Sequence, residues 1–151
     1  MSLHYTLHLS GPPQVLAADA VVHGFESEKA LALLAYLAIV ERPINRDHLA
    51  GLFWGELDTE HSRGNLRRVL HNLTHLLPGC VEVERHSVRF HSAAATVDVR
   101  EFRRWSAAVD LAALQAALTW CSGELLEGLA LAGCPEFELW LVGARERWRA
   151  E

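Results

Sequence analysis

The fold is decided by residues 42–78, which read RPINRDHLAGLFWGELDTEHSRGNLRRVLHNLTHLLP and predict two helices joined by a short polar turn. In the first helix, expected at 46–54, Asn45 is suited to be the N-cap and Asp47 is favourable in the first turn. The second helix, expected at 59–77, has apolar residues spaced three and four apart, as on a helix with one buried stripe. The stripe consists of Leu66, Val69, Leu70, Leu73, Leu76 and Leu77.

The opposite face of this second helix is basic and polar. No acidic residue occurs between His61 and Val81, although the chain has 19 Asp and Glu residues against 14 Lys and Arg residues. Arginine, asparagine and histidine without neighbouring carboxylates suit phosphates and base edges. The pattern indicates local contact with nucleic acid, and an ordinary solvated basic helix surface is the alternative. The face consists of His61, Gly64, Arg67, Arg68, His71, Asn72 and His75.

The composition limits what kind of protein this is. The chain has 151 residues, of which 50% are hydrophobic, so it can form one domain or two small ones. A net charge of −5 argues against a non-specific polyanion binder, because such proteins are usually basic throughout. Three cysteines without CxxC spacing indicate reduced thiols and a cytoplasmic protein. The longest apolar run, residues 30–40, is too short to span a membrane.

The order of the remaining elements predicts an α+β winged helix-turn-helix in residues 1–95. An N-terminal β-meander, three helices and a C-terminal β-hairpin wing succeed one another along this part of the chain. We expect strands at 3–9, 15–17 and 20–22, helices at about 27–40, 46–54 and 59–77, and the hairpin at 81–91.

Residues 96–151 predict an all-α partial domain. Asp98 and Asp110 are suited to cap two helices, and Pro135 is suited to the start of a third. The second of these helices should bury a stripe formed by Leu111, Leu114, Leu118 and Cys121. No stop signal ends the last helix, so we expect the domain to be truncated.

Five segments of the chain resemble one known family. They are EKALALLAYLAIVERPINRDHLAGLFW (28–54), NLRRVLHNL (65–73), VDVREF (97–102), GELLEGL (123–129) and EFELWLVGARERW (136–148). Together they resemble the SARP family of bacterial transcriptional activators, in which an OmpR-like winged helix precedes a bacterial transcriptional activator domain. The resemblance implies a sequence-specific DNA-binding activator without a cofactor. The implied partners are double-stranded promoter DNA, read as tandem direct repeats, RNA polymerase subunits and a second copy of the chain on DNA.

The resemblance also assigns roles to residues. The 59–77 helix would lie in the major groove, the 81–91 hairpin would be the wing, and Arg46 would meet the DNA backbone. Arginine can bind guanine, Asn72 could pair with adenine, and Gly64 would allow close approach of the DNA. Arg63 has an alternative role, as an ion-pair partner of Glu60 or Asp58. The implied DNA-binding residues are Arg46, Arg63, Gly64, Arg67, Arg68, His71, Asn72, His75, Arg85, His86 and Arg89.

Rival functions have weaker support in the sequence. A winged helix that binds protein instead of DNA would suit the acidic balance and the histidines at 71 and 75, where relatives carry more basic residues. His71 and His75 have the i, i+4 spacing of zinc ligands, but further ligands at a recognisable spacing are lacking, so we expect no metal site. The sequence has no Gly-rich phosphate loop and no GxSxG motif, so no enzyme activity is expected.

Overall fold

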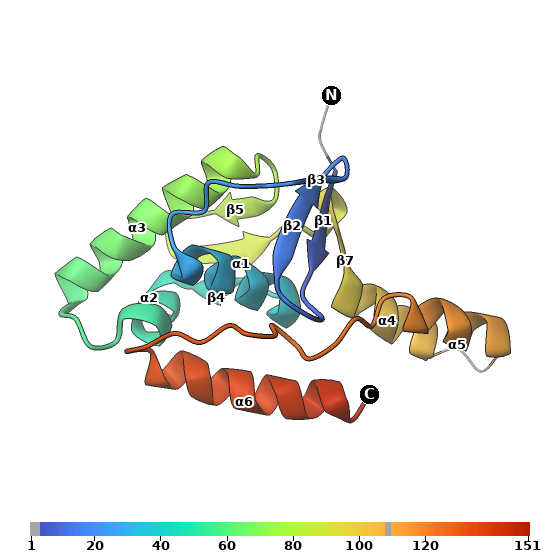
Figure 1. Cartoon of the computed structure of the whole chain (residues 1–151). Coiled ribbons are helices and arrows are strands. Elements are labelled where there is room, and N and C mark those ends of the chain that lie inside the picture. Colours follow the sequence, from blue (N-terminus) through green and yellow to red (C-terminus); the bar gives the residue numbers. More distant parts are fainter. Residues whose placement is uncertain (1–3, 108–109) are drawn as a thin grey trace.

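The computed structural model describes residues 4–107 and 110–151 and has a mixed α/β fold (Figure 1). Within these residues there are two small sheets and six α-helices. The first sheet has the order β3-β2-β1-β7, in which β7 is parallel to β1 and the other pairs are antiparallel. Its strands are β1 (Tyr5–His8), β2 (Gln14–Ala17), β3 (Ala20–Val21) and β7 (Ala95–Val97). Leu3, where the first strand was expected to begin, lies outside the described residues.

The second sheet is antiparallel and has the order β4-β6-β5. Its strands are β4 (Ile44–Asn45), β5 (Val81–Val83) and β6 (Ser87–Phe90). The helices are α1 (Glu28–Val40), α2 (Arg46–Trp54), α3 (Thr59–Leu76), α4 (Asp98–Ser106), α5 (Leu111–Leu118) and α6 (Pro135–Arg149), with a 3-10 turn η1 (Ser92–Ala94) before β7.

Side-chain caps start the three helices of the first half. The Ser27 hydroxyl accepts the Ala30 amide, and Asn45 Oδ1 accepts the Asp47 amide at 2.8 Å. Asp58 Oδ1 accepts the His61 amide at 2.8 Å. Each cap satisfies amide groups that the first turn of a helix leaves without partners. The expected helix starts are therefore confirmed.

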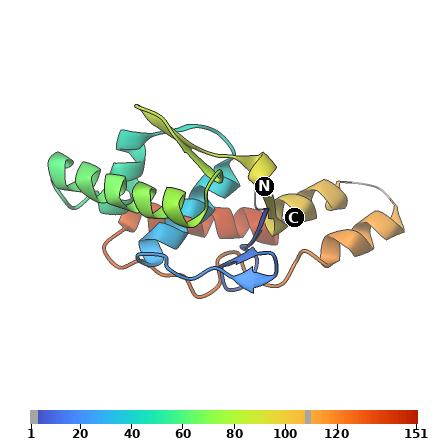
Figure 2. The ribbon, with the colours of Figure 1, turned by 90° about the horizontal axis from the view of Figure 1, so that it is seen from above.

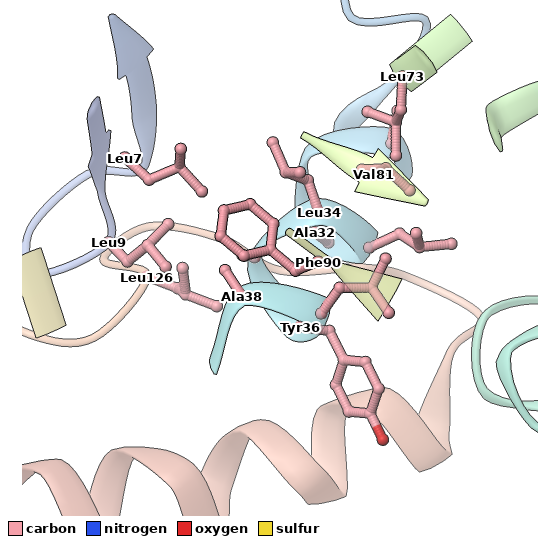
Figure 3. Close-up of a cluster of buried hydrophobic side chains, with 14 of the residues drawn as sticks. Leu7, Leu9, Ala32, Leu34, Tyr36, Ala38, Leu73, Val81, Phe90 and Leu126 are labelled. Carbon is pink, nitrogen blue, oxygen red and sulfur yellow. The ribbon is translucent and has the colours of Figure 1, made fainter. Parts of the chain in front are cut away.

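The core is continuous between the two halves of the chain. Helix α1 is at the centre of the core. All of its residues from 30 to 38 are buried except Leu31. Figure 3 shows Leu126 of the second half beside Leu9 of the first, and both are fully buried. Helix α6 lies along the same core, where Trp140 is 4.8 Å from Tyr36 and Phe137 is 4.9 Å from Phe53, measured between ring centroids.

Backbone hydrogen bonds also join the halves. Strand β7 pairs with β1 in the register Tyr5↔Ala95 and Leu7↔Val97, so the expected boundary at residue 95 falls inside a strand of the first sheet. Further along the chain, the Leu126 amide donates to the Leu9 carbonyl at 2.7 Å. The second half was expected to be helical throughout. It differs because β7 completes a sheet and residues 119–134 form no helix.

The expected apolar stripe of α5 is wrong. Leu111 and Leu118 are 71% and 66% exposed, Leu114 and Cys121 are exposed, and Ala113 and Ala117 are buried instead. Small alanine side chains allow the close approach of α4, the helix that packs on α5. In the part of the chain that the structure describes, no helix is both long and apolar enough to cross a bilayer.

Candidate nucleic-acid interface

Three elements enclose a shallow hollow of about 490 Å³ on one side of the molecule: the start of α2, the exposed face of α3 and the tip of the β5–β6 hairpin. Figure 2 shows the hairpin projecting beside α3, at the end of the molecule opposite α5. Four arginines and one aspartate supply the charged groups of the hollow. The lining residues are Asn45, Arg46, Asp47, Arg63, Leu66, Arg67, Arg85 and His86.

The hairpin tip is fixed to the start of α2 by backbone pairing. Strand β4 runs directly into α2 and pairs with β6 in the register Asn45↔Ser87. The Arg46 amide donates to the His86 carbonyl at 2.9 Å, and Arg46 Nη1 donates to the Glu84 carbonyl at 3.1 Å. The position of Arg85 and His86 relative to α2 therefore follows from the second sheet.

Arg63 makes a two-pronged contact that joins α3 to α2. Its Nε and Nη2 donate to the two carboxylate oxygens of Asp47, at 2.9 and 3.1 Å. This hydrogen bond lowers the pKa of the Asp47 carboxyl and raises the pKa of Arg63. Arg63 does not pair with Glu60 or Asp58, the partners expected as the alternative to DNA, but with Asp47 on the facing helix α2. In the sequence, Asp47 stands out only as an acidic residue in the first turn of α2.

Arg67 and Arg85 are the two arginines of the hollow for which the described residues provide no hydrogen-bond or ion-pair partner. Both are exposed. Among the residues that the structure describes, no carboxylate or carbonyl forms a hydrogen bond or ion pair with either guanidinium. These two side chains can therefore bind an external anion without first breaking an internal contact.

Arg68 and Asn72 lie on another side of α3, against the loop that precedes α1. Arg68 Nε donates to Glu26 Oε1 at 2.6 Å. Asn72 Oδ1 accepts the Glu26 amide at 2.9 Å, and Asn72 Nδ2 donates to the Gly24 carbonyl at 3.1 Å. Asn72 thus holds the loop to α3 with both ends of its amide. The structure does not bring this pair into the hollow.

The remaining candidates lie along α3 or on the hairpin. His71 and His75 are exposed and stacked with ring centroids 6.4 Å apart. No group of three or more potential metal ligands occurs in residues 4–107 and 110–151. At Gly64 an added Cβ would meet no atom within 4 Å, so contacts inside the protein do not require glycine there. Arg89 pairs with Glu82 across the hairpin at 2.5 Å, and this pairing lowers the pKa of Glu82.

Comparison with known proteins shows a likeness among solved structures. No protein-family model matches the sequence, and no curated protein matches it. Among solved structures, Mycobacterium tuberculosis EmbR, determined in complex with a low affinity phosphopeptide, is 22% identical with a TM-score of 0.69. The match covers 98% of this chain but 43% of EmbR, so the chain spans less than half the length of that protein. The likeness shows that the chain has the fold of the matching part of EmbR.

Proposed function

We propose that this chain is the DNA-binding part of a transcriptional regulator, in which α2 and α3 with the β5–β6 hairpin act as a winged helix-turn-helix. The observation that carries the proposal is the arginine-lined hollow on a chain whose net charge is −5. Because the protein is acidic overall, its affinity for DNA must come from a local cationic surface, and the hollow supplies one. The EmbR-like fold supports a regulator of SARP type.

In this proposal α3 lies in the major groove. Its 18 residues span about 27 Å, long enough to cross the groove, and the face bearing Gly64, Arg67, His71 and His75 is turned toward the bases. The hairpin is the wing, and it offers Arg85 and His86 to a phosphate or a neighbouring minor groove. Arg46, at the start of α2, contacts the DNA backbone.

The wider role is proposed on the resemblance to SARP activators. It comprises activation through RNA polymerase subunits, tandem direct repeats as the operator, and a homodimer on DNA in the cytoplasm. No enzymatic step and no cofactor belong to the proposal. The second candidate is a winged helix that binds protein, and it is favoured by the carboxylates that pair with Arg63, Arg68 and Arg89.

Two adjacent arginines make a matched test of the DNA-binding proposal. DNA fragments are first selected from a random pool by the 151-residue chain, and its affinity for the selected DNA is then measured at several salt concentrations. Arg67→Ala should weaken binding about 10- to 100-fold, because its guanidinium is free in the hollow. Arg68→Ala should weaken DNA binding less than about 3-fold, because Glu26 already offsets the charge of Arg68.

Arg104→Ala controls for a general loss of positive charge. Arg104 is exposed and lies on α4, a helix that does not line the hollow. Affinity for the selected DNA should fall steeply with salt, as counterion release requires. If the protein selects no sequence and its binding shows no salt slope, the DNA-binding proposal is wrong and the protein-binding candidate is favoured.

A further inference from the structure

The Asp47–Arg63 pair has a geometry that suits recognition of a base. A guanidinium group carries five N–H donors in one plane. Asp47 takes the edge formed by Nε and one hydrogen of Nη2. The opposite edge, with one hydrogen on each of Nη1 and Nη2, has the spacing of the guanine O6 and N7 acceptors. The pair therefore holds one fork of Arg63 and leaves a second fork free.

The pair contributes little to stability by itself. The side chains of Arg63 and Asp47 are 54% and 63% exposed, and an exposed ion pair contributes little to the free energy of folding because water screens it. Orientation is a different effect. A free arginine has many rotamers, and binding must order them, whereas a side chain already held in one orientation loses less entropy on contact. Arg67, one turn along α3 in the same hollow, has no such partner among the described residues.

Asp47 also places a negative charge in a hollow that is otherwise cationic. Among the charged lining residues it is the one carboxylate beside four arginines. A carboxylate there weakens the attraction to phosphates, which every DNA sequence presents equally. It reduces sequence-independent affinity while it directs Arg63 to a base edge. Both effects raise the ratio of specific to non-specific binding.

We propose that Asp47 is a positioning residue that orients Arg63 toward a guanine in the major groove and so sets the sequence specificity of the protein. This rests on the proposed DNA-binding function. Asp47 acts through Arg63 and does not itself touch DNA. The pair is a specificity device that joins the two helices of the helix-turn-helix.

The test compares Asp47→Asn with Glu82→Gln in the whole 151-residue chain. Each substitution removes one carboxylate that pairs with an arginine, but Glu82 lies on the hairpin and holds Arg89. Affinity is measured for the DNA selected by the wild-type protein, for random DNA of equal length and for each single-base variant of the selected site. Thermal unfolding shows whether either variant is destabilised.

With Asp47→Asn we expect affinity for random DNA to rise and the selected-to-random ratio to fall about 10-fold, the size of one bidentate base contact. Preference should be lost at a single G·C pair, the one lost in Arg63→Ala. Glu82→Gln should change both affinities in parallel. In the Arg63→Ala background, Asp47→Asn should no longer change base preference. An unchanged ratio and unchanged base preference in Asp47→Asn would overturn the proposal while leaving DNA binding intact. Wild-type protein that binds selected and random DNA equally would overturn the DNA-binding function as well.

Discussion

At the scale of single residues, Asn72 shows how an amide on an exposed helix face can have a structural task. The sequence pattern places Asn72 with the basic residues of α3, and an asparagine on a recognition helix can pair with adenine. In the structure both ends of the Asn72 amide bind the loop before α1. No sequence rule predicts this contact, because the loop lies 46 and 48 residues earlier in the chain.

We predict that Asn72→Ala destabilises the protein by about 1–2 kcal/mol, because two side chain–backbone hydrogen bonds are lost. Asn65→Ala is the matched control on the same helix. Its amide only accepts from Arg68, so the expected change is below about 0.5 kcal/mol. Denaturant unfolding measures the stability of both variants. The Asn72→Ala variant should select the same DNA sequence as the wild-type protein. A lost preference for adenine at one position would instead support the role that the resemblance implies.

The three cysteines should differ sharply in reactivity. Cys80 is fully buried, and burial raises the pKa of its thiol to about 11, so almost no thiolate forms at pH 8. Cys134 is buried and donates its thiol hydrogen to the Phe53 carbonyl, whereas Cys121 is exposed. Native protein treated with iodoacetamide at pH 8 should therefore gain one label, at Cys121, and denatured protein three. Labelling of Cys80 at the rate of Cys121 would contradict the buried position of Cys80, directly before β5.

At the scale of elements, the first half could be predicted from local signals and α5 could not. Ser27, Asn45 and Asp58 mark the starts of α1, α2 and α3 because capping depends on neighbouring amides alone. In α5 all residues but Gln115 are alanine or leucine, so no polar side marks the exposed face. The shape of the facing helix α4 then selects the alanines for burial. That choice depends on tertiary packing.

The junction of β1 and α4 depends on one carboxylate. Asp98 is 1% exposed, and its two oxygens accept amides from Val99, Leu9 and Ser10 at 2.8–2.9 Å. The sequence predicts that Asp98 caps α4, but Asp98 is the first residue of the helix, and the N-cap position belongs to Val97, which makes no side-chain cap. The Asp98 carboxylate instead binds the chain after β1, 88 and 89 residues away. Its buried carboxylate therefore links the two halves.

We predict that Asp98→Asn lowers stability by about 2–3 kcal/mol, because an NH₂ group then faces a buried backbone N–H. Asp110→Asn is the control. Asp110 caps α5 through the Ala113 amide, and asparagine is an equally good N-cap, so stability should change by less than about 0.5 kcal/mol. Denaturant unfolding of the two variants measures the difference. Equal effects would mean that the hydrogen bonds from Leu9 and Ser10 to Asp98 contribute little to stability.

At the scale of the whole molecule, the interlocking of the halves is the feature that sequence patterns leave out. Strand β7 has three residues, and its partner β1 lies 90 residues earlier in the chain, so no local periodicity marks it. The arginine hollow is likewise an assembly of α2, α3 and the hairpin. The sequence predicts five of the lining residues as DNA contacts, namely Arg46, Arg63, Arg67, Arg85 and His86. It does not predict that Asp47 pairs with Arg63, because that contact exists only when α2 and α3 face each other.

The last prediction concerns cooperativity. Phe137 on α6 is fully buried and packs on Phe53 of α2, so Phe137→Ala leaves a cavity between the halves and should cost about 3–5 kcal/mol. Because hydrogen bonds and apolar contacts join both halves, we expect a single transition, about 10 °C lower, at the same temperature by circular dichroism and tryptophan fluorescence. Leu139→Ala, two positions along the same helix but 75% exposed, should leave the transition within about 2 °C. Two separate transitions in Phe137→Ala, with only one of them lowered, would show that the halves unfold independently and that the contacts between α6 and the first half contribute little to folding.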